Sequence, residues 1–253
     1  MANKQTFTGL RRTAYEVKQY RVWRKLIPII IAIIILLLLL GYIISVLYMK
    51  YGAFTVMVNK FDNLDYALTL SDNQDFHGMT SRLNAEIDEI VTNISVSSLP
   101  DYLDNIDGPH NGENYVAYTF YCRNEGKKPI TYNYDMYIAN MTYDVERAAR
   151  VRLYVNGEYT DYAYARTDGV DGPEPGTTAF QSGNTIVKKD INHFKPGDVT
   201  KFTVVIWVEG DDPERVDKIL GGKFKIDMAM TVVCEEDENG NPVDKDGNPI
   251  EKA

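Results

Sequence analysis

The sequence predicts a mainly β protein: an extracytoplasmic β-sandwich, jelly-roll-like and with short helices, preceded by one transmembrane helix. Three observations predict it: an uncharged apolar run near the N-terminus, later segments that alternate apolar and polar residues, and turn-forming residues between those segments. The 253 residues are 44% hydrophobic and 25% charged, which are ordinary values for a folded protein and argue against wholesale disorder.

Charge is distributed unevenly along the chain. Residues 1–25 contain seven Lys or Arg and one Glu, a net +6, so the rest of the chain carries −15 within the formal total of −9. A negative total argues against a nucleic-acid partner. We interpret residues 1–25 as a basic cytoplasmic tail that is too short to fold alone.

The apolar run extends from Leu26 to Leu47 and holds no charged residue in 22 positions. As a helix it would be about 33 Å long, close to the roughly 30 Å of a bilayer's hydrocarbon core. Pro28 would fall in the first turn, where its missing N–H costs little. We therefore predict a transmembrane signal anchor over residues 26–47, with Leu26 and Leu47 as its ends and the lipid bilayer as its partner.

Two other interpretations of this run are weaker. A buried core helix would be shorter and less uniform, and a cleaved signal peptide would have about 7–15 apolar residues followed by small ones. Cleavage after Ala53 would place the bulky Tyr51 where a small side chain is needed. Because the positive flank stays inside, residues 48–53 would connect the anchor to an extracellular C-terminal part of a single-pass cell-membrane protein.

Residues 54–234 are predicted to form the β-sandwich, because period-two alternation produces antiparallel strands with one buried face. The clearest alternating segments are Tyr115–Cys122, Ile130–Ile138, Thr200–Val208 and Phe224–Cys234, and weaker ones are Phe54–Val58 and Ile94–Val96. Many short strands joined by turns favour a jelly-roll or related topology.

One hairpin can be placed in register from the sequence. Asn156-Gly157 favours a type I′ turn, because both turn residues need positive φ. The cross-strand pairs that a two-residue loop predicts are Val155–Glu158, Tyr154–Tyr159, Leu153–Thr160, Arg152–Asp161 and Val151–Tyr162. One face would then carry a tyrosine pair beside an ion pair, and the other face would be apolar.

Helices are predicted only in the connections. Pro213–Leu220 follows an Asp at the N-cap and ends at two glycines, which is typical of a two-turn helix. Gly78–Ile90 and Tyr143–Ala149 are softer candidates. Residues 235–253 are rich in acidic and turn-forming residues, so they are predicted to form a solvated, disordered acidic tail.

Several stretches resemble a known group of surface proteins. Lys195–Val199, Ile206–Pro213 and Arg150–Gly157 resemble stretches of Firmicutes proteins related to the TasA matrix-fibre and camelysin group. The resemblance covers about half of the outer domain and implies a Gram-positive cell surface, a jelly-roll-like domain and matrix or envelope roles. Two departures are the retained anchor and the start of the first strand at Phe54, only seven residues after the apolar run, which argues against donating that strand to a fibre.

The camelysin resemblance implies a metallopeptidase, so a zinc site is the chemistry to look for. The chain lacks His-Glu-x-x-His, and His77, His110 and His193 lie more than 30 positions apart. An acidic cluster could bind calcium, although helix capping and a solvated face explain it as well. Its members are Glu209, Asp211, Asp212, Glu214 and Asp217. We predict no catalytic residue, no metal site and no cofactor.

Tyrosine is the largest compositional oddity, with 18 residues. Outward-facing tyrosines can stack on sugars or hold a partner, and Tyr154, Tyr159 and Tyr164 are the candidates for such binding. The burial of the aromatic side chains distinguishes a binding role from a role in packing. If at least five of the six Tyr or Trp side chains at positions 118, 132, 134, 154, 159 and 207 are buried, little is left for sugar stacking.

The two cysteines, Cys122 and Cys234, both end inward-facing registers. A disulfide between them is possible in an extracytoplasmic compartment and would stabilise the fold by up to about 4.7 kcal/mol, and two buried thiols are the alternative.

These features together predict a membrane-anchored structural or interaction module of the cell envelope, without catalysis. The alternatives are a glycan- or peptide-binding surface domain and a camelysin-like metallopeptidase. Other envelope proteins or surface glycans would be its partners.

Overall fold

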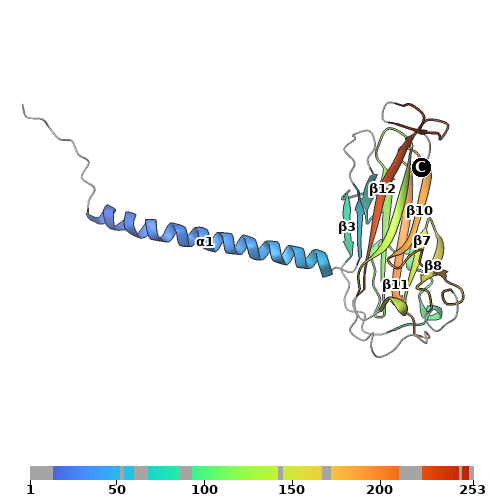
Figure 1. Ribbon diagram of the computed structural model, residues 1–253, viewed down its shortest axis with the longest axis horizontal. Coiled ribbons are helices and arrows are strands. Elements are labelled where there is room, and N and C mark those ends of the chain that lie inside the picture. Colours follow the sequence, from blue (N-terminus) through green and yellow to red (C-terminus); the bar gives the residue numbers. More distant parts are fainter. Residues whose placement is uncertain are drawn as a thin grey trace, which may run out of the picture. The chain divides into compact units, whose positions relative to one another are not determined.

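The computed structural model divides the chain into two units (Figure 1). Within the residues that the structure describes, the first unit, Met1–Tyr51, forms one helix, and the second, Gly52–Ala253, forms two β-sheets. The residues that the structure describes are 14–51, 54–59, 68–85, 93–141, 145–166, 172–210, 224–244 and 247–250.

Helix α1 (Ala14–Tyr51) is long and apolar enough to cross a membrane over Val22–Ile44, a stretch of 23 residues with a mean hydropathy of 3.2. None of this stretch is buried against protein. The predicted apolar helix is confirmed, but Leu26 and Leu47 end the apolar run and not the helix. Pro28 therefore lies in the interior of α1, where it removes one backbone hydrogen bond, and not in the first turn.

Sheet A has the strand order β10-β6-β12-β1-β3, and β13 pairs with the C-terminal end of β12. Its strands are β1 (Phe54–Val58), β3 (Arg82–Ala85), β6 (Ile130–Met141), β10 (Thr185–Phe194), β12 (Phe224–Glu236) and β13 (Pro242–Val243). β1 runs parallel to β12, and the other pairs are antiparallel. The first strand of the unit is thus enclosed by two neighbours within its own sheet.

Sheet B has the strand order β2-β5-β11-β7-β8-β9, and β4 pairs with β5. Its strands are β2 (Leu68–Ser71), β4 (Gly108–Pro109), β5 (Tyr115–Asn124), β7 (Ala149–Val155), β8 (Glu158–Ala163), β9 (Thr178–Ala179) and β11 (Val199–Val208). β8 and β9 are parallel. Because both sheets are mixed, this strand order does not establish the jelly-roll topology expected from the sequence.

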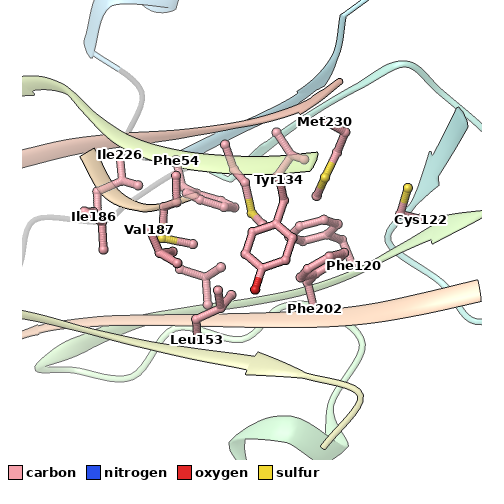
Figure 2. Packing of buried hydrophobic residues seen from close by; sticks show 14 of the residues in the cluster. Phe54, Phe120, Cys122, Tyr134, Leu153, Ile186, Val187, Phe202, Ile226 and Met230 are labelled. Atoms are coloured by element: carbon pink, nitrogen blue, oxygen red, sulfur yellow. The ribbon is translucent and has the colours of Figure 1, made fainter. Parts of the chain in front are cut away.

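The two sheets pack face to face around one hydrophobic core, so the unit is a β-sandwich (Figure 2). Phe54 of β1 lies against Tyr118 of β5 with ring centroids 6.0 Å apart. Tyr134 of β6 meets Phe202 of β11 edge to face at 5.3 Å. Contacts of this kind connect the sheets directly and give the core its aromatic centre.

The buried faces that alternation predicts for β5, β6, β11 and β12 are confirmed except at Val208 and Cys234, which are only partly buried. Their buried inward residues are Val116, Tyr118, Phe120, Cys122, Ile130, Tyr132, Tyr134, Met136, Ile138, Phe202, Val204, Ile206, Ile226, Met228, Met230 and Val232. The predicted hairpin is also confirmed in all five cross-strand pairs. Asn156 and Gly157 have φ of 52° and 93°, which is the left-handed geometry that a type I′ turn requires.

The connections differ from the predictions in two places. The helix expected over Gly78–Ile90 is wrong in its described part, since Arg82–Ala85 forms β3 and pairs with β1. Pairing with an open sheet edge outweighs a soft helical pattern there. In the described part of the third candidate, residues 145–149, a 3-10 turn at Val145–Arg147 is followed by the first residue of β7. The helix predicted over Pro213–Leu220 lies outside the described residues.

The sandwich extends beyond Cys234, where the sequence indicates an acidic tail. A β-bulge between Val232 and Cys234 shifts the alternation, so Cys234 is only partly buried. Glu235 and Glu236 continue β12 and are buried, and β13 follows them. The continuation of the sheet therefore depends on an irregularity that period-two alternation does not reveal.

Two similar turns build the segment after β12. The carboxylate of Asp237 accepts hydrogen bonds from the backbone and side-chain nitrogens of Asn241 at 2.8 and 2.9 Å. Asp244 and Asn248 repeat this arrangement seven positions later. Aspartate side chains that bind the backbone a few residues ahead stabilise tight turns, so these acidic residues are structural.

Candidate binding surface on the outer face of sheet B

The three tyrosines predicted for binding do not form one strip. Tyr154 is 7% exposed and Tyr159 is 54% exposed, and their rings lie 5.2 Å apart on the outer face of sheet B. Tyr164 packs edge to face on Phe180 and joins the core between the sheets. Of the six aromatic side chains at positions 118, 132, 134, 154, 159 and 207, whose burial argues against sugar stacking, five are buried and only Tyr159 is exposed.

Arg152 holds the exposed ring of Tyr159 in place. Its guanidinium donates to both carboxylate oxygens of Asp161 at 2.7 and 2.8 Å and lies 4.2 Å from the centroid of the Tyr159 ring. The hydrogen bond to Asp161 raises the pKa of Arg152 above its ordinary value. The exposed tyrosine is thus one side of a stacked, charge-paired cluster and has a fixed position.

A second hydrophobic cluster covers the middle of this outer face. Its buried members are Leu99, Leu103, Ala117, Tyr154, Val205 and Trp207. The indole N–H of Trp207 donates to Glu209 at 2.9 Å, and the same carboxylate accepts the backbone N–H of Val96 at 3.1 Å. The chain from Ile94 to Leu103 therefore covers Trp207, as a second core layer, and Trp207 offers no platform to a ligand.

A polar cleft of about 550 Å³ opens beside this cluster. Its lining residues come from the loop after β2, the 3-10 turn at Leu103–Asn105, the Asn156-Gly157 turn and strands β5 and β11. They are Gln74, Asp104, Tyr121, Asn156, Gly157, Val199 and Lys201. The Asn156-Gly157 turn, which fixes the hairpin register, thus also forms one wall of the cleft. The turn is predictable from the sequence, whereas the cleft is not.

Charged and hydroxyl groups in and beside the cleft are already joined to one another. Lys201 Nζ lies 3.1 Å from a carboxylate oxygen of Asp104, and Thr203 donates to Asp104 at 2.7 Å. Tyr121 donates to Asp107 at 2.5 Å, and burial together with this hydrogen bond raises the pKa of Tyr121 above its ordinary value. A ligand here would meet a preformed set of polar groups of both charges.

The cysteines lie on different sheets and are not joined by a disulfide in the structure. Cys122 of β5 is buried in the core, and burial raises the pKa of its thiol to about 12. Cys234 of β12 lies at the bulge and is partly exposed. The inward register predicted for Cys122 is confirmed, and that predicted for Cys234 is wrong because of the bulge.

The histidines occupy separate places in the fold. His110 contacts the carbonyl oxygen of Gly108 at 2.8 Å in sheet B, whereas His193 belongs to β10 in sheet A. Among the described residues, no group of three His, Cys, Asp or Glu could hold a metal ion. Of the acidic cluster, Glu209 is buried beside Trp207, and Asp211, Asp212, Glu214 and Asp217 lie outside the described residues.

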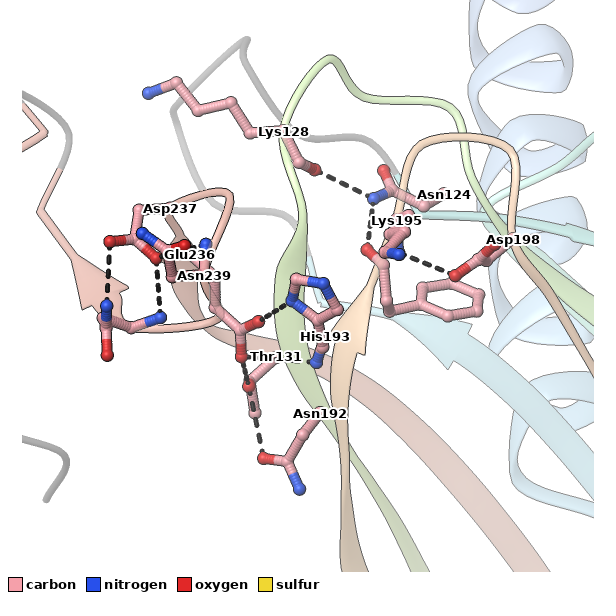
Figure 3. A network of polar contacts seen from close by, with 12 residues as sticks. Asn124, Lys128, Thr131, Asn192, His193, Lys195, Asp198, Glu236, Asp237 and Asn239 are labelled. Carbon is pink, nitrogen blue, oxygen red and sulfur yellow. Dashed lines mark hydrogen bonds and ion pairs between the residues drawn. The ribbon is translucent and has the colours of Figure 1, made fainter.

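A buried carboxylate organises a polar network at the opposite sheet (Figure 3). The Glu236 side chain is 3% exposed and contacts Nδ1 of His193 at 2.9 Å. It also accepts the hydroxyl of Thr131 and, at 3.3 Å, the backbone N–H of His193. Burial alone would raise the pKa of Glu236, but these hydrogen bonds outweigh it and lower the pKa below its ordinary value.

This network could not be predicted from the sequence, for a physical reason. The network needs His193 at a positive φ of 52° and a break in pairing between Ile191 and Phe194. It also needs Glu236 inside the sheet, beyond the predicted end of the domain. The sequence carries no signal for the first two conditions, since histidine adopts positive φ only uncommonly.

No protein-family model matches the chain, and no curated protein matches it significantly. Solved structures show weak similarity. AvmM, described as catalysing macrocyclization in alchivemycin A biosynthesis, is 13% identical with a TM-score of 0.20, over 47% of this chain and 79% of that chain. A β-glucosidase from Kluyveromyces marxianus is 11% identical with a TM-score of 0.23, over 72% of this chain but only 19% of that enzyme. Similarity at this level gives no indication of function.

Proposed function

We propose that this chain is a membrane-anchored, cell-surface structural or interaction module of the envelope, with its N-terminus in the cytoplasm and its sandwich outside. The observation that supports this most strongly is the apolar helical stretch Val22–Ile44, 23 residues long and not buried, in which Arg24 and Lys25 at the N-terminal end are the only charged residues. A strongly basic segment precedes it. Basic residues beside a membrane helix favour the cytoplasmic side. The resemblance to Gram-positive surface proteins and the jelly-roll topology belong to the same proposal.

The chemistry of the sandwich supports a module that does not catalyse. Its outer aromatic side chains are mostly used in packing, and β1 is enclosed between β12 and β3. The edge strand β10 carries Lys188, Lys189 and Asp190 at its centre and is irregular at both ends. Charges and bulges on an edge strand prevent pairing with further chains, so a partner would use a sheet face.

The orientation can be tested by labelling single cysteines in intact cells that express the full chain. In a background with Cys122→Ala and Cys234→Ser, the exposed Lys127→Cys reports on the sandwich and Ala2→Cys reports on the N-terminus. A membrane-impermeant maleimide should label Lys127→Cys in intact cells, and Ala2→Cys only after permeabilisation. The reverse pattern would overturn the proposal.

The polar cleft favours a second candidate, a glycan- or peptide-binding surface domain. Calorimetric titration of the full chain in detergent with soluble peptidoglycan fragments tests it. Gln74→Ala changes a lining side chain, and Tyr159→Ala changes an exposed side chain outside the cleft. Saturable binding that Gln74→Ala weakens and Tyr159→Ala leaves unchanged supports the cleft, whereas no saturable binding, or equal loss in both variants, contradicts it.

A further inference from the structure

Three side chains bring a hydroxyl, a carboxamide and a carboxylate together in sheet A (Figure 3). Thr131 lies near the start of β6, Asn192 in β10, and Glu236 at the end of β12, and these strands are neighbours in the order β10-β6-β12. Thr131 is fully buried, and Glu236 is nearly so. The three groups are those of a nucleophile, an electrophile and a base.

The Thr131 hydroxyl contacts both Glu236 and Asn192. It has one hydrogen to donate and two lone pairs, and its short contact with Glu236 Oε1 takes the hydrogen. Oγ1 of Thr131 also lies 3.3 Å from Oδ1 of Asn192. The carboxamide carbon is one C=O bond of about 1.2 Å from that oxygen, so it lies within about 4.5 Å of Oγ1. An attack requires the two atoms to approach to roughly 3–3.5 Å, so the Asn192 side chain has to turn toward Oγ1.

Glu236 is positioned and ionised as a base must be. His193 contacts both carboxylate oxygens, through its ring at 2.9 Å and through its backbone N–H at 3.3 Å, which fixes the orientation of the group. The lowered pKa of Glu236 keeps the carboxylate charged at neutral pH. Its Oε1 faces the hydroxyl hydrogen that an attack by Thr131 must release.

We propose that Thr131 and Asn192 form an intramolecular ester cross-link between β6 and β10. Oγ1 of Thr131 attacks the carboxamide carbon of Asn192, while Glu236 takes the hydroxyl proton. Glu236 then gives this proton to the amide nitrogen, the C–N bond breaks, and the nitrogen leaves as ammonia. The product is an ester between Thr131 Oγ1 and Asn192 Cγ, and the step needs no oxidant, reductant or co-reactant.

The position of the cross-link matches a weak point of the sheet. β10 is an edge strand, and its pairing with β6 is interrupted between Ile191 and Phe194. Asn192 lies inside this interruption. The ester therefore fastens the edge strand where the backbone ladder does not hold it.

Mass spectrometry of the intact full chain, purified in detergent, tests the proposal. The chain should be lighter than its sequence by the mass of one ammonia molecule, and peptide mapping should recover one linked pair that contains Thr131 and Asn192. Thr131→Ser should keep the link, because it keeps the hydroxyl, and Asn133→Ala on the same strand should keep it too. A chain of full mass, with the two peptides recovered separately, overturns the proposal.

Two further variants separate the ester from a succinimide and test the base. Asn192 could lose ammonia alone by forming a succinimide with the following backbone nitrogen, and that loss would persist in Thr131→Val, whereas the ester would not. Persistence in Thr131→Val therefore overturns the ester. Glu236→Gln should abolish the link while circular dichroism still shows the sheet structure, and a linked Glu236→Gln chain would contradict the role of Glu236 as base.

Discussion

Arg152 and Asp161 face each other across β7 and β8 and are joined by two hydrogen bonds of 2.7 and 2.8 Å. The pairing follows from the Asn156-Gly157 turn, which sets every rung of this hairpin. Both side chains are largely shielded from solvent. This ion pair is therefore a shielded contact within the outer face of sheet B and not a solvent-exposed surface pair.

Asp161→Ala should lower the free energy of unfolding by about 2 kcal/mol, because it leaves a shielded guanidinium without its carboxylate. Urea denaturation of the full chain in detergent, followed by the fluorescence of nearby Trp207, measures the change. Asp190→Ala, at an exposed position of β10, should change stability by less than about 0.5 kcal/mol. Equal losses in the two variants would show that the pair contributes nothing specific.

Gly157→Ala should destabilise the sandwich by about 1–2 kcal/mol, since alanine is strained at the φ of 93° that the turn requires. Gly183→Ala is the matched control. A Cβ at Gly183 meets no atom within 4 Å, and the residue does not have positive φ. Thermal unfolding of both variants under one condition compares them, and similar melting temperatures would contradict the assigned turn geometry.

Acid should weaken the polar network around Glu236. The pKa of Glu236 is lower in the folded chain than its ordinary value of 4.5, so its ionised form stabilises the fold above that value. This stabilisation is lost as the pH falls through the folded pKa. Between about pH 7 and pH 3, the melting temperature of the wild type should therefore fall more than that of Glu236→Gln. Parallel pH profiles would refute the contribution of this carboxylate.

The two thiols should react at very different rates. Cys122 is buried and its pKa is raised to about 12, so at pH near 8 it is almost entirely protonated and shielded, whereas Cys234 is partly exposed. Iodoacetamide should label Cys234 first in the folded chain, and both cysteines after denaturation. If neither thiol reacts in denaturant until a reductant is added, the two cysteines form a disulfide after all.

Much of the sandwich could be predicted because its strands alternate buried residues with residues of the other face. Alternation placed the inward residues of β5 and β6 correctly, and those of β11 except Val208, and a two-residue turn placed the hairpin register. The mistakes occur where a local irregularity or a distant partner decides the structure. The bulge before Cys234 reverses the expected burial, and β3 forms only because β1 offers it an edge.

The candidate site was less predictable, since it depends on loops meeting in space. Trp207 lies in a second core layer, with Leu99 and Leu103 as its cover. The cleft combines Gln74, Asp104 and Lys201, which belong to separate segments with no shared motif. Periodicity describes one element at a time, so it gives no information on such convergence.

The enclosure of β1 between β12 and β3 has a consequence for biosynthesis. Asn59, just after β1, donates to Thr231 of β12 across 172 positions of sequence. Contacts this distant require a large loop to close, which slows folding. A nascent chain emerging from the ribosome would present β1 long before its partner is translated, so sheet A can close only after β12 has also been made. Truncated products that lack β12 should therefore be degraded early.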